Sequence, residues 1–465
     1  MRTTLTMTAG QHQLLRRHLL PGDGLEAVAL ALCGRRSGDQ DHRLLMHEVM
    51  LIPHEHCQRS ALHITWPSTA LKALLERAAR YGMAVLKIHS HPGGHPSFSE
   101  VDDLADAELF PSIHACTDDG LPHASAVMLP DGMIFGRAHM PDGSAAYLES
   151  VTVLGDTIII WRVPGSRIDP APEFAVRHVQ AFGAGTFAAL RGLRIAVVGC
   201  SGTGSVIIDQ LARLGVGRLI LVDPDRVETK NLNRILNATA ADVGRLKVVV
   251  QRRFVNALGI GTEVESHPCD LGEPAAWRAV AGADVVFGCM DSVDGRHLLN
   301  RLATFYLLPY IDVGIRLDAD GVGGVDQVCG SVHYLQPGLS TLRTREVFTE
   351  EQLRAAGMKR FSPEAYEERQ KEGYIRGIEE DRPAVNGVNM FFSALAVLEL
   401  LARLHPYRDD PNAECAGQTI SLTGGFWLRR AEAPIDEGLA RHVGRGDMVP
   451  FLGMPFLAAE AGAAT

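Results

Sequence analysis

The sequence predicts an α/β chain with two units: a mixed α/β unit, followed by a doubly wound unit with a mainly parallel sheet. Three observations lead to this prediction. The chain has 465 residues, which suits two or three domains. Strand and helix patterns alternate along most of its length. A segment rich in Pro and Gly, "VPGSRIDPAPEF", interrupts this alternation. We therefore expect domains at 1–165 and 175–430, a linker at 166–174 and a C-terminal extension at 431–465.

The first unit is expected to alternate short strands with an amphipathic helix. Strands are predicted over "AVALALCG" and "HEVMLIPH", and a helix over "PSTALKALLERAARYG", which Gly82 ends. The apolar strand "MAVLKI" then runs directly into a histidine-rich segment. Strands around "ASAVMLP" and "GMIFGRAH" complete a small sheet. The histidines therefore follow the end of a buried strand.

The second unit has the pattern of a doubly wound fold. The buried strand "LRIAVVG" is followed by glycines, by the helical segment "SVIIDQLARLG" and by the strand "RLILVD". This strand–helix–strand alternation predicts a parallel sheet. The long apolar helix "GVNMFFSALAVLELLARL" is expected to close the core.

Composition argues against several classes of partner. The formal net charge is -10, so nothing favours binding to nucleic acid or to an anionic membrane. No uninterrupted apolar run reaches the ~18 residues typical of a membrane helix. The 8 cysteines form no CxxC pair, as is typical of reduced thiols in the cytosol. We expect a cytoplasmic protein without nucleic-acid or membrane partners.

The segment "HSHPGGHPSFSEVD" predicts a metal site. Residues two apart on a strand point to the same face, so His89 and His91 present their rings together. Ser99 starts a helix whose first turn carries Asp102, a candidate third ligand. Two histidines and a carboxylate leave a fourth position open, as in catalytic zinc sites. A base is then needed, and Glu26 is the candidate, with Asp23 as an alternative.

Each part of this pattern also has a simpler interpretation. His-x-His alone is more often a pair of surface or core histidines, and Ser-x-x-Asp alone is more often a helix N-cap. The combined spacing is H-x-H-P, six residues, S, two residues and D, with a Glu on an upstream strand. It resembles the JAMM/MPN (Mov34/PAD, prokaryotic JAB) metalloprotease motif, over roughly residues 1–160.

This resemblance implies a chemistry and a class of substrate. It implies Zn²⁺ held by His89, His91 and Asp102, with Glu26 as general acid and base. Ser99 would stabilise the oxyanion of the tetrahedral intermediate. Members of the family cleave peptide or isopeptide bonds after the C-terminal tail of ubiquitin-like proteins, and some prokaryotic members process sulfur-carrier relatives.

A glycine-rich loop in the second unit is a candidate phosphate site. "GCSGTGS" lies between a predicted strand and a predicted helix, where backbone N–H groups and the helix dipole favour an anion. Gly199, Gly202 and Gly204 follow the spacing GxxGxG, rather than the dinucleotide spacing GxGxxG. The loop by itself is therefore weak evidence.

The polar residues that follow this loop suggest which nucleotide chemistry it serves. Asp223 ends the next strand, where a carboxylate can hold a ribose hydroxyl. Asn231 and Arg234 follow in "DPDRVETKNLNR", and Lys247 and Asp291 come further along the chain. Two cations and an amide for a triphosphate, with an acid for Mg²⁺, suit adenylation of a carboxylate. Any one of these residues alone is an ordinary surface charge.

As an ordered set these residues resemble the ThiF/MoeB family, a Rossmann-like fold shared with ubiquitin-activating enzymes. "DPDRVETKNLNR" stands for the family's D-x-D-x-V-x-x-x-NL-x-R, and the resemblance covers roughly 174–430. It implies ATP with Asp223 on its ribose, Arg234 and Lys247 on its phosphates, and Asp291 on Mg²⁺. The segment "VRHVQAFG" resembles the family's entry helix, so Arg177 would reach the ATP of a neighbouring subunit in a homodimer.

The sequence departs from this family at its cysteines. Thr341 and Thr344 stand where many relatives carry a first CxxC pair, and no second pair exists. We therefore expect no structural zinc in this unit. The stretch 345–385 contains no cysteine that could form a thioester. Cys329 and Cys415 remain as candidates, although each is also typical of a small buried thiol.

Together the two resemblances imply a bifunctional enzyme of a prokaryotic ubiquitin-like or sulfur-carrier pathway. One unit would process or remove the modifier, and the other would adenylate its C-terminal carboxylate. One alternative keeps both chemistries but acts on a peptide natural product or a small sulfur-carrying conjugate. Another is a non-catalytic, nucleotide-responsive scaffold. The identity of the modifier and the order of the two activities stay open.

Overall fold

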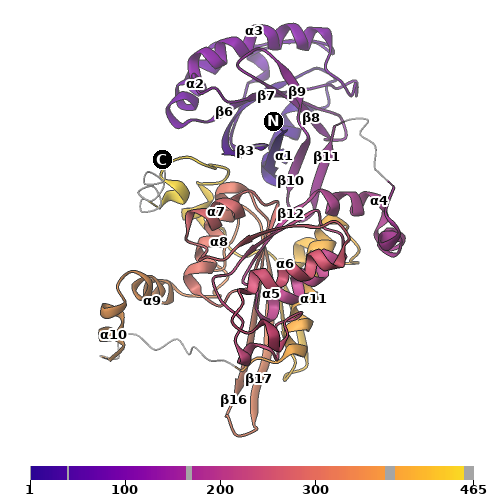
Figure 1. Ribbon diagram of the computed structural model, residues 1–465. Coiled ribbons are helices and arrows are strands. Elements are labelled where there is room, and N and C mark those ends of the chain that lie inside the picture. The colour runs from indigo at the N-terminus through magenta and orange to yellow at the C-terminus, as the bar shows by residue number, and fades with distance from the viewer. Residues whose placement is uncertain (1, 39–40, 164–169, 372–382, 455–465) are drawn as a thin grey trace. The chain divides into compact units, whose positions relative to one another are not determined.

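The computed structural model describes residues 2–38, 41–163, 170–371 and 383–454, which divide into two α/β units (Figure 1). The first unit is 1–167 with 305–307 and 442–465, and the second is 168–304 with 308–441. Residues 164–169, which include part of the predicted linker, lie outside the described residues, as do residues 455–465 of the predicted extension.

The first unit is built on a mixed sheet, which among the described residues has the strand order β11-β10-β1-β3-β2-β6-β7-β8-β9. Its strands are β1 Arg2–Thr8, β2 Val28–Ser37, β3 Asp41–Leu51, β6 Ala84–Ser90, β7 His123–Met128, β8 Ile134–His139, β9 Ala145–Tyr147, β10 Ser150–Leu154 and β11 Ile158–Arg162. A short hairpin, β4 Gln58–Arg59 and β5 Ile64–Thr65, follows the 3-10 turn η1 His54–His56. β6 pairs antiparallel with β2 and parallel with β7, so the histidine-bearing strand is internal.

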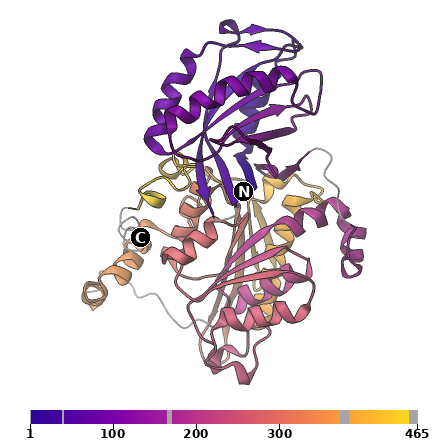
Figure 2. The ribbon, with the colours of Figure 1, turned by 45° about the horizontal axis from the view of Figure 1, so that its top comes forward.

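Helices cover both faces of this sheet (Figure 2). They are α1 Ala9–Leu19, α2 Thr69–Tyr81 and α3 Glu100–Thr117. Alternate residues of β2 point to opposite faces. Ala29 and Ala31 lie in one apolar core with Leu15 and Leu19 of α1. Leu30 lies in a second core, which contains residues of α2 and α3. The sheet is therefore buried on both faces, and the start of α3 lies over the end of β6.

The segment 442–454 belongs to the first unit, although it ends the described chain. Gly446 forms a parallel β-bridge with Arg35. A Cβ added to Gly446 would lie 2.2 Å from the Arg35 carbonyl oxygen, and one added to Gly444 would lie 2.4 Å from that of Met46. Both glycines also have positive φ, +57° and +68°. Only residues without a side chain permit this approach to the sheet.

A buried histidine makes the first unit sensitive to acid. The Nδ1 atom of His123 accepts the Val85 N–H at 2.9 Å, and its Nε2 atom lies 3.1 Å from the Thr117 hydroxyl. Burial, and secondly the charge of Arg35, lower the pKa of His123 from 6.5 to about 2. The unfolded chain therefore binds the extra proton, so stability falls as pH drops below about 6.5.

Because of the His123 imidazole, we expect the free energy of unfolding of the first unit to fall by about 2 kcal/mol between pH 8 and pH 5. The free energy of unfolding of the first unit can be measured at each pH by urea unfolding, with hydrogen exchange of peptides from this unit as the readout. His123→Asn keeps an acceptor for the Val85 N–H but removes the titration, so its slope should be smaller. A variant with the wild-type slope contradicts the prediction.

The second unit has a sheet of order β14-β13-β12-β15-β16-β17-β18-β19 among the described residues. Its strands are β12 Arg194–Val198, β13 Arg218–Val222, β14 Glu263–His267, β15 Val285–Gly288, β16 Tyr310–Ala319, β17 Val325–Leu335, β18 Gly417–Ser421 and β19 Phe426–Arg430. Neighbours from β14 to β16 pair parallel, and those from β16 to β19 pair antiparallel. The predicted doubly wound, mainly parallel arrangement is confirmed for the first five strands of this order. The last three extend the same sheet antiparallel.

The helices of this unit are α4 Val176–Gly192, α5 Gly202–Arg213, α6 Lys247–Leu258, α7 Pro274–Ala281, α8 Val293–Tyr306, α9 Glu350–Phe361, α10 Pro363–Lys371, α11 Asn386–Leu404 and α12 Glu437–Ala440. By length and composition α11 could cross a membrane, but it is mostly buried within the structure. It packs against α5, β16 and β17, and this packing is typical of a core helix.

Candidate functional site

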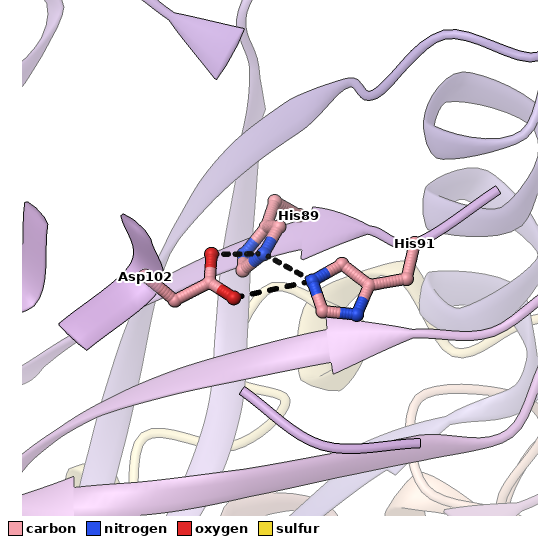
Figure 3. Close-up of side chains that lie close together, drawn as sticks. All are labelled: His89, His91 and Asp102. Atoms are coloured by element: carbon pink, nitrogen blue, oxygen red, sulfur yellow. Dashed lines mark hydrogen bonds and ion pairs between the residues drawn. The ribbon is translucent and has the colours of Figure 1, made fainter. Parts of the chain in front are cut away.

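Three predicted metal ligands converge where β6 ends and α3 begins (Figure 3). The Nε2 atoms of His89 and His91 lie 3.1 Å apart. His89 Nε2 is 2.9 Å from Asp102 Oδ1, and His91 Nε2 is 3.3 Å from Asp102 Oδ2. One ligand atom from each residue falls within 4.8 Å of the others, and all three residues are buried. The two-residue strand period predicted that His89 and His91 lie together, and the helix cap at Ser99 predicted the place of Asp102.

The same carboxylate also caps the helix that carries it. The Ser99 hydroxyl accepts the Asp102 N–H at 3.2 Å, and Asp102 Oδ2 accepts the Ser99 N–H at 2.7 Å. The Ser99 hydroxyl also donates to Asp102 Oδ2 at 2.8 Å. This capping box fixes the first turn of α3. Ser99 and Asp102 can therefore cap the helix while Asp102 also faces the two histidines as a candidate metal ligand.

The second ring nitrogen of His91 orients the ring. His91 Nδ1 lies 3.0 Å from the carbonyl oxygen of His95, so its N–H donates to this carbonyl and Nε2 faces the cluster. His95 therefore contributes its backbone, whereas its ring bonds the Ser97 hydroxyl at 2.7 Å. Two imidazole Nε2 atoms and a carboxylate that face one another form a ligand set typical of zinc. The residues present fit this metal.

Charges in the cluster favour the ionised carboxylate. Burial alone would raise the pKa of Asp102, but its hydrogen bonds with His89 and His91 hold that pKa well below the ordinary value. Burial lowers the pKa of His89. For His91 burial acts in the same direction, but the hydrogen bonds to Asp102 and to the His95 carbonyl, together with the charges of Asp102 and Glu26, outweigh it and raise the pKa. An ionised carboxylate beside two imidazoles suits a dication.

Glu26 lines a pocket with His89 and Asp102 of the cluster, whereas Asp23, the alternative base, is not among its lining residues. Burial raises the pKa of Glu26 from 4.5 to about 7, a value at which a carboxylate exchanges protons readily near neutral pH. A bound dication would lower it. Asp23 is exposed and forms an ion pair with Arg59 at 2.8 Å. The pocket is lined by Glu26, Val28, Leu62, His63, Ile64, Trp66, Lys87, His89, Val101, Asp102 and Ala105.

Sequence reasoning missed the apolar wall and the cation of this pocket. Leu62 on the β4–β5 hairpin is 82% exposed, and Val101 at the start of α3 is 42% exposed. Lys87 is buried two residues before His89 on β6. The two-residue strand period that located His89 and His91 would also have located Lys87. The hairpin lacks a comparable signal, because each of its strands has only two residues.

The predicted phosphate loop packs closely against its neighbours. A Cβ on Gly199 would lie 2.6 Å from the Cys289 carbonyl oxygen, and one on Gly204 would lie 1.8 Å from that of Gly199. A Cβ on Gly202 would lie 2.3 Å from Asn389 Nδ2 of α11, a neighbour that the sequence did not predict. These glycines therefore bring β12, α5 and the loop after β15 together at the carboxyl end of the sheet.

The start of α5 is chemically available for an anion. Within the described residues Ser201 precedes this helix and makes no side-chain capping bond. The first N–H groups of α5 thus have neither a helical partner nor a capping side chain, and a phosphate can accept them. This observation fits the predicted nucleotide.

Asp223 and Lys247 lie near each other at the end of β13. Asp223 Oδ2 accepts the Cys200 N–H at 2.7 Å, and its Oδ1 accepts the Asp225 N–H at 2.8 Å. Lys247 Nζ lies 2.8 Å from Asp225 Oδ2 and 4.0 Å from Asp223 Oδ1. Burial raises the pKa of Asp223. A fixed carboxylate and a buried ammonium offer a ribose partner and a phosphate partner.

The remaining predicted nucleotide residues differ in their surroundings. Asn231 is buried, and its Oδ1 accepts the Glu228 N–H at 3.1 Å, where it caps a 3-10 turn. Arg234 is half-buried, and its Cδ lies 3.3 Å from the position of a Cβ on Gly202, so its stem contacts the glycine loop. Asp291 is exposed in the loop after β15. The structure thus brings Arg234 to the loop and leaves Asp291 open to solvent.

The predicted intersubunit and thioester residues lie elsewhere in this unit. Arg177 is exposed near the start of α4 and donates to Gln180 at 2.9 Å. Cys415 is buried and Cys329 is partly exposed. Burial raises the pKa of Cys329, which lowers its thiolate fraction at neutral pH. None of the 8 cysteines, all among the described residues, forms a disulfide.

Hydroxyls hold the turn where relatives would carry a CxxC pair. The Thr341 N–H donates to the Thr344 hydroxyl at 3.0 Å, and the Thr341 hydroxyl donates to Asp436 Oδ2 at 2.9 Å. Hydrogen bonds thus organise this segment. The expectation that the unit has no structural zinc stays a prediction.

Comparison with known protein families gives a match in each half of the chain. The family model of the ThiF family matches residues 175–424, more than half of the chain. The model described as prokaryotic homologs of the JAB domain matches residues 8–135. The first match contains the glycine loop with Asp223 and Lys247, and the second contains the His–His–Asp cluster.

Individual relatives match over shorter stretches. The SAMP-activating enzyme E1 of Haloferax volcanii is 36% identical over 118 residues, which are 25% of this chain and 44% of that protein. The adenylyltransferase and sulfurtransferase MOCS3 of Mus musculus is 40% identical over 111 residues, 24% of each chain. The chain thus spans less than half the length of these curated relatives. A solved structure of E. coli MccB with succinimide is 18% identical, covering 57% of this chain and 73% of that one with a TM-score of 0.45.

Proposed function

The chain belongs to the ThiF family and carries a JAB-type unit before the ThiF region, and from this premise we propose a bifunctional enzyme. One unit hydrolyses a peptide or isopeptide bond with zinc. The other uses ATP and Mg²⁺ to adenylate the C-terminal carboxylate of a ubiquitin-like or sulfur-carrier protein. The observation that carries the proposal is the donor set His89, His91 and Asp102, of which His89 and Asp102 line one pocket with Glu26.

In the hydrolytic half, the residues of the chain would hold the metal and move one proton. His89, His91 and Asp102 bind the metal, which supplies Lewis-acid activation of water and of the scissile carbonyl. Glu26 accepts the proton of the attacking water and delivers it to the leaving amine as the C–N bond breaks. The Ser99 hydroxyl, which donates to Asp102 Oδ2 at 2.8 Å in this structure, would turn away from that carboxylate to donate to the developing oxyanion.

In the adenylating half, an oxygen of the tail carboxylate attacks the α-phosphorus of ATP, and pyrophosphate leaves. The uncapped start of α5 receives phosphate oxygens. Lys247 and Arg234 neutralise phosphate charge, Asn231 supports the segment that carries Arg234, and Asp223 binds the ribose. Asp291 would hold Mg²⁺, which would supply charge neutralisation for the departing pyrophosphate.

Other features of the proposal concern assembly and location. We infer a homodimer formed through the ThiF unit, with the exposed Arg177 reaching the nucleotide of the partner subunit. The free thiols support a cytoplasmic location. One substrate class then explains the fusion, because both reactions act at the same C-terminal tail.

Metal analysis and pyrophosphate exchange test the two halves separately. The purified chain should hold one zinc per chain. It should catalyse exchange of labelled pyrophosphate into ATP with a sulfur-carrier protein that ends in Gly-Gly. Exchange with a short peptide but not with this protein would instead favour the peptide-product alternative. Zinc-free protein without exchange would favour the scaffold.

A further inference from the structure

Three polar side chains, one from each of three neighbouring strands, form a row beside the His–His–Asp cluster. Lys87 on β6 is paired with Ser125 on β7, and Ser125 is paired with Arg137 on β8. Side chains of directly paired residues point to the same face of a sheet. Lys87 also shares this face with His89, two residues further along β6. The row therefore continues the face that carries the first metal ligand.

All three side chains of the row bind one carboxylate on α3. Lys87 Nζ lies 2.5 Å from Asp106 Oδ1. The Ser125 hydroxyl donates to Asp106 Oδ2 at 2.6 Å, and Arg137 Nη2 donates to the same oxygen at 2.7 Å. Asp106 is 1% exposed. Because Asp106 lies four residues after Asp102, the two carboxylates lie on the same side of α3, one turn apart.

The guanidinium of Arg137 also reaches the first turn of the helix. Its Nη2 donates to the Asp102 carbonyl oxygen at 3.3 Å, and its Nη1 donates to the Asp103 carboxylate. Its carbon lies 4.0 Å from the centre of the Phe98 ring. Arg137 thus contacts residues on both sides of the Ser99 N-cap. It links β8 to the turn that carries the third metal ligand.

We propose that Arg137, with Asp106, is a positioning residue for the metal centre, which holds the Asp102 carboxylate at its place in the ligand set. The inference rests on the proposed zinc site. Asp102 is the one ligand that comes from a helix, whereas His89 and His91 come from the end of a strand. Rotation or sliding of α3 would therefore remove Asp102 alone. Contacts at residues 98, 102, 103 and 106 prevent that movement.

A purely stabilising ion-pair network makes a different prediction. Buried ion pairs contribute little net stability, and loss of one partner destabilises the fold. If the network only stabilised the unit, a folded variant would bind zinc as tightly as the wild type. If it positions Asp102, the folded variant loses zinc affinity, because partners of the ligands typically contribute 10–100-fold.

Zinc affinity, measured by competition with a chromogenic chelator, tests this inference. Arg137→Met in the full chain should bind zinc roughly 10–100-fold more weakly. Cobalt bound by this variant should also show an altered visible spectrum, as expected when one ligand is misplaced. Arg137→Lys keeps the positive charge but loses the forked geometry of the guanidinium. Its zinc affinity should therefore lie between that of the wild type and that of Arg137→Met. Arg77→Met is the matched control, because Arg77 pairs with the Glu48 carboxylate in the same unit.

The outcomes separate this inference from the proposed function. Wild-type protein that binds no zinc overturns the proposed hydrolase and this inference with it. Wild-type protein that binds zinc, with equal affinity in a folded Arg137→Met variant, overturns the inference alone. If Arg137→Met does not fold, Asp103→Asn decides, because the Asp103 side chain is 59% exposed and we expect its loss to leave the fold intact. This variant should bind zinc several-fold more weakly, and wild-type affinity there overturns the inference.

Discussion

Glu26→Gln should lower the rate of peptide or isopeptide hydrolysis by roughly 10²–10⁴-fold, the usual contribution of a general acid and base. The amide keeps the size of the side chain but accepts no proton. Glu26 lines the pocket of the metal cluster, and burial raises its pKa to about 7. Zinc content should stay unchanged, because Glu26 is not one of the three ligands. Release of a C-terminal extension from a sulfur-carrier protein, followed by mass spectrometry, measures the rate.

A matched carboxylate serves as the control for this variant. Glu100 is exposed in the first turn of α3, two residues before Asp102. Glu100→Gln removes the same charge at a similar place, so it should retain near wild-type hydrolysis. If both variants lost the same fraction of the hydrolysis rate, the effect would be a general electrostatic one. If Glu26→Gln hydrolysed at the wild-type rate, Glu26 would not be the general acid and base.

Lys247→Met should lower ATP–pyrophosphate exchange by roughly 10²–10³-fold, the usual result of removing one preorganised group that stabilises developing charge. Lys247 is 6% exposed at the start of α6, and its ammonium lies 2.8 Å from Asp225 Oδ2. Its loss leaves carboxylates beside the predicted phosphate position without a buried cation. Hydrolysis by the first unit should be unaffected.

Two further variants distinguish a phosphate contact from a change in surface charge. Lys230→Met removes an exposed lysine that pairs with Glu228 in the same segment, and exchange should remain near wild type. Lys247→Arg keeps the charge with another shape, so it should recover part of the exchange. Wild-type exchange in Lys247→Met would contradict the predicted role.

The parts of the site that follow from local periodicity could be predicted from the sequence. The strand period brings His89 and His91 together, and the helix cap places Asp102 one turn into α3. The doubly wound arrangement of the second unit follows equally from its alternating strands and helices. Each of these predictions depends on residues that are close in sequence.

Features that depend on distant pairing were not predictable in this way. Residues 442–454 join the first unit through glycines whose neighbours lie about 400 residues earlier. The row of Lys87, Ser125 and Arg137 exists only because β6, β7 and β8 pair in one register. Likewise, strands β18 and β19 extend the main sheet by pairing antiparallel beyond β17. Such contacts follow from the complete topology.

The central claim is that both units act on the same C-terminal tail. Pyrophosphate exchange with a sulfur-carrier protein that ends in Gly-Gly, compared with the same protein extended by a few residues, tests it most directly. We predict that wild-type enzyme exchanges with both proteins. Glu26→Gln should exchange normally with the mature protein and show no exchange with the extended one, since it cannot expose the carboxylate. Failure of the wild type to exchange with either protein, or equal exchange of the extended protein in wild type and Glu26→Gln, would contradict the account.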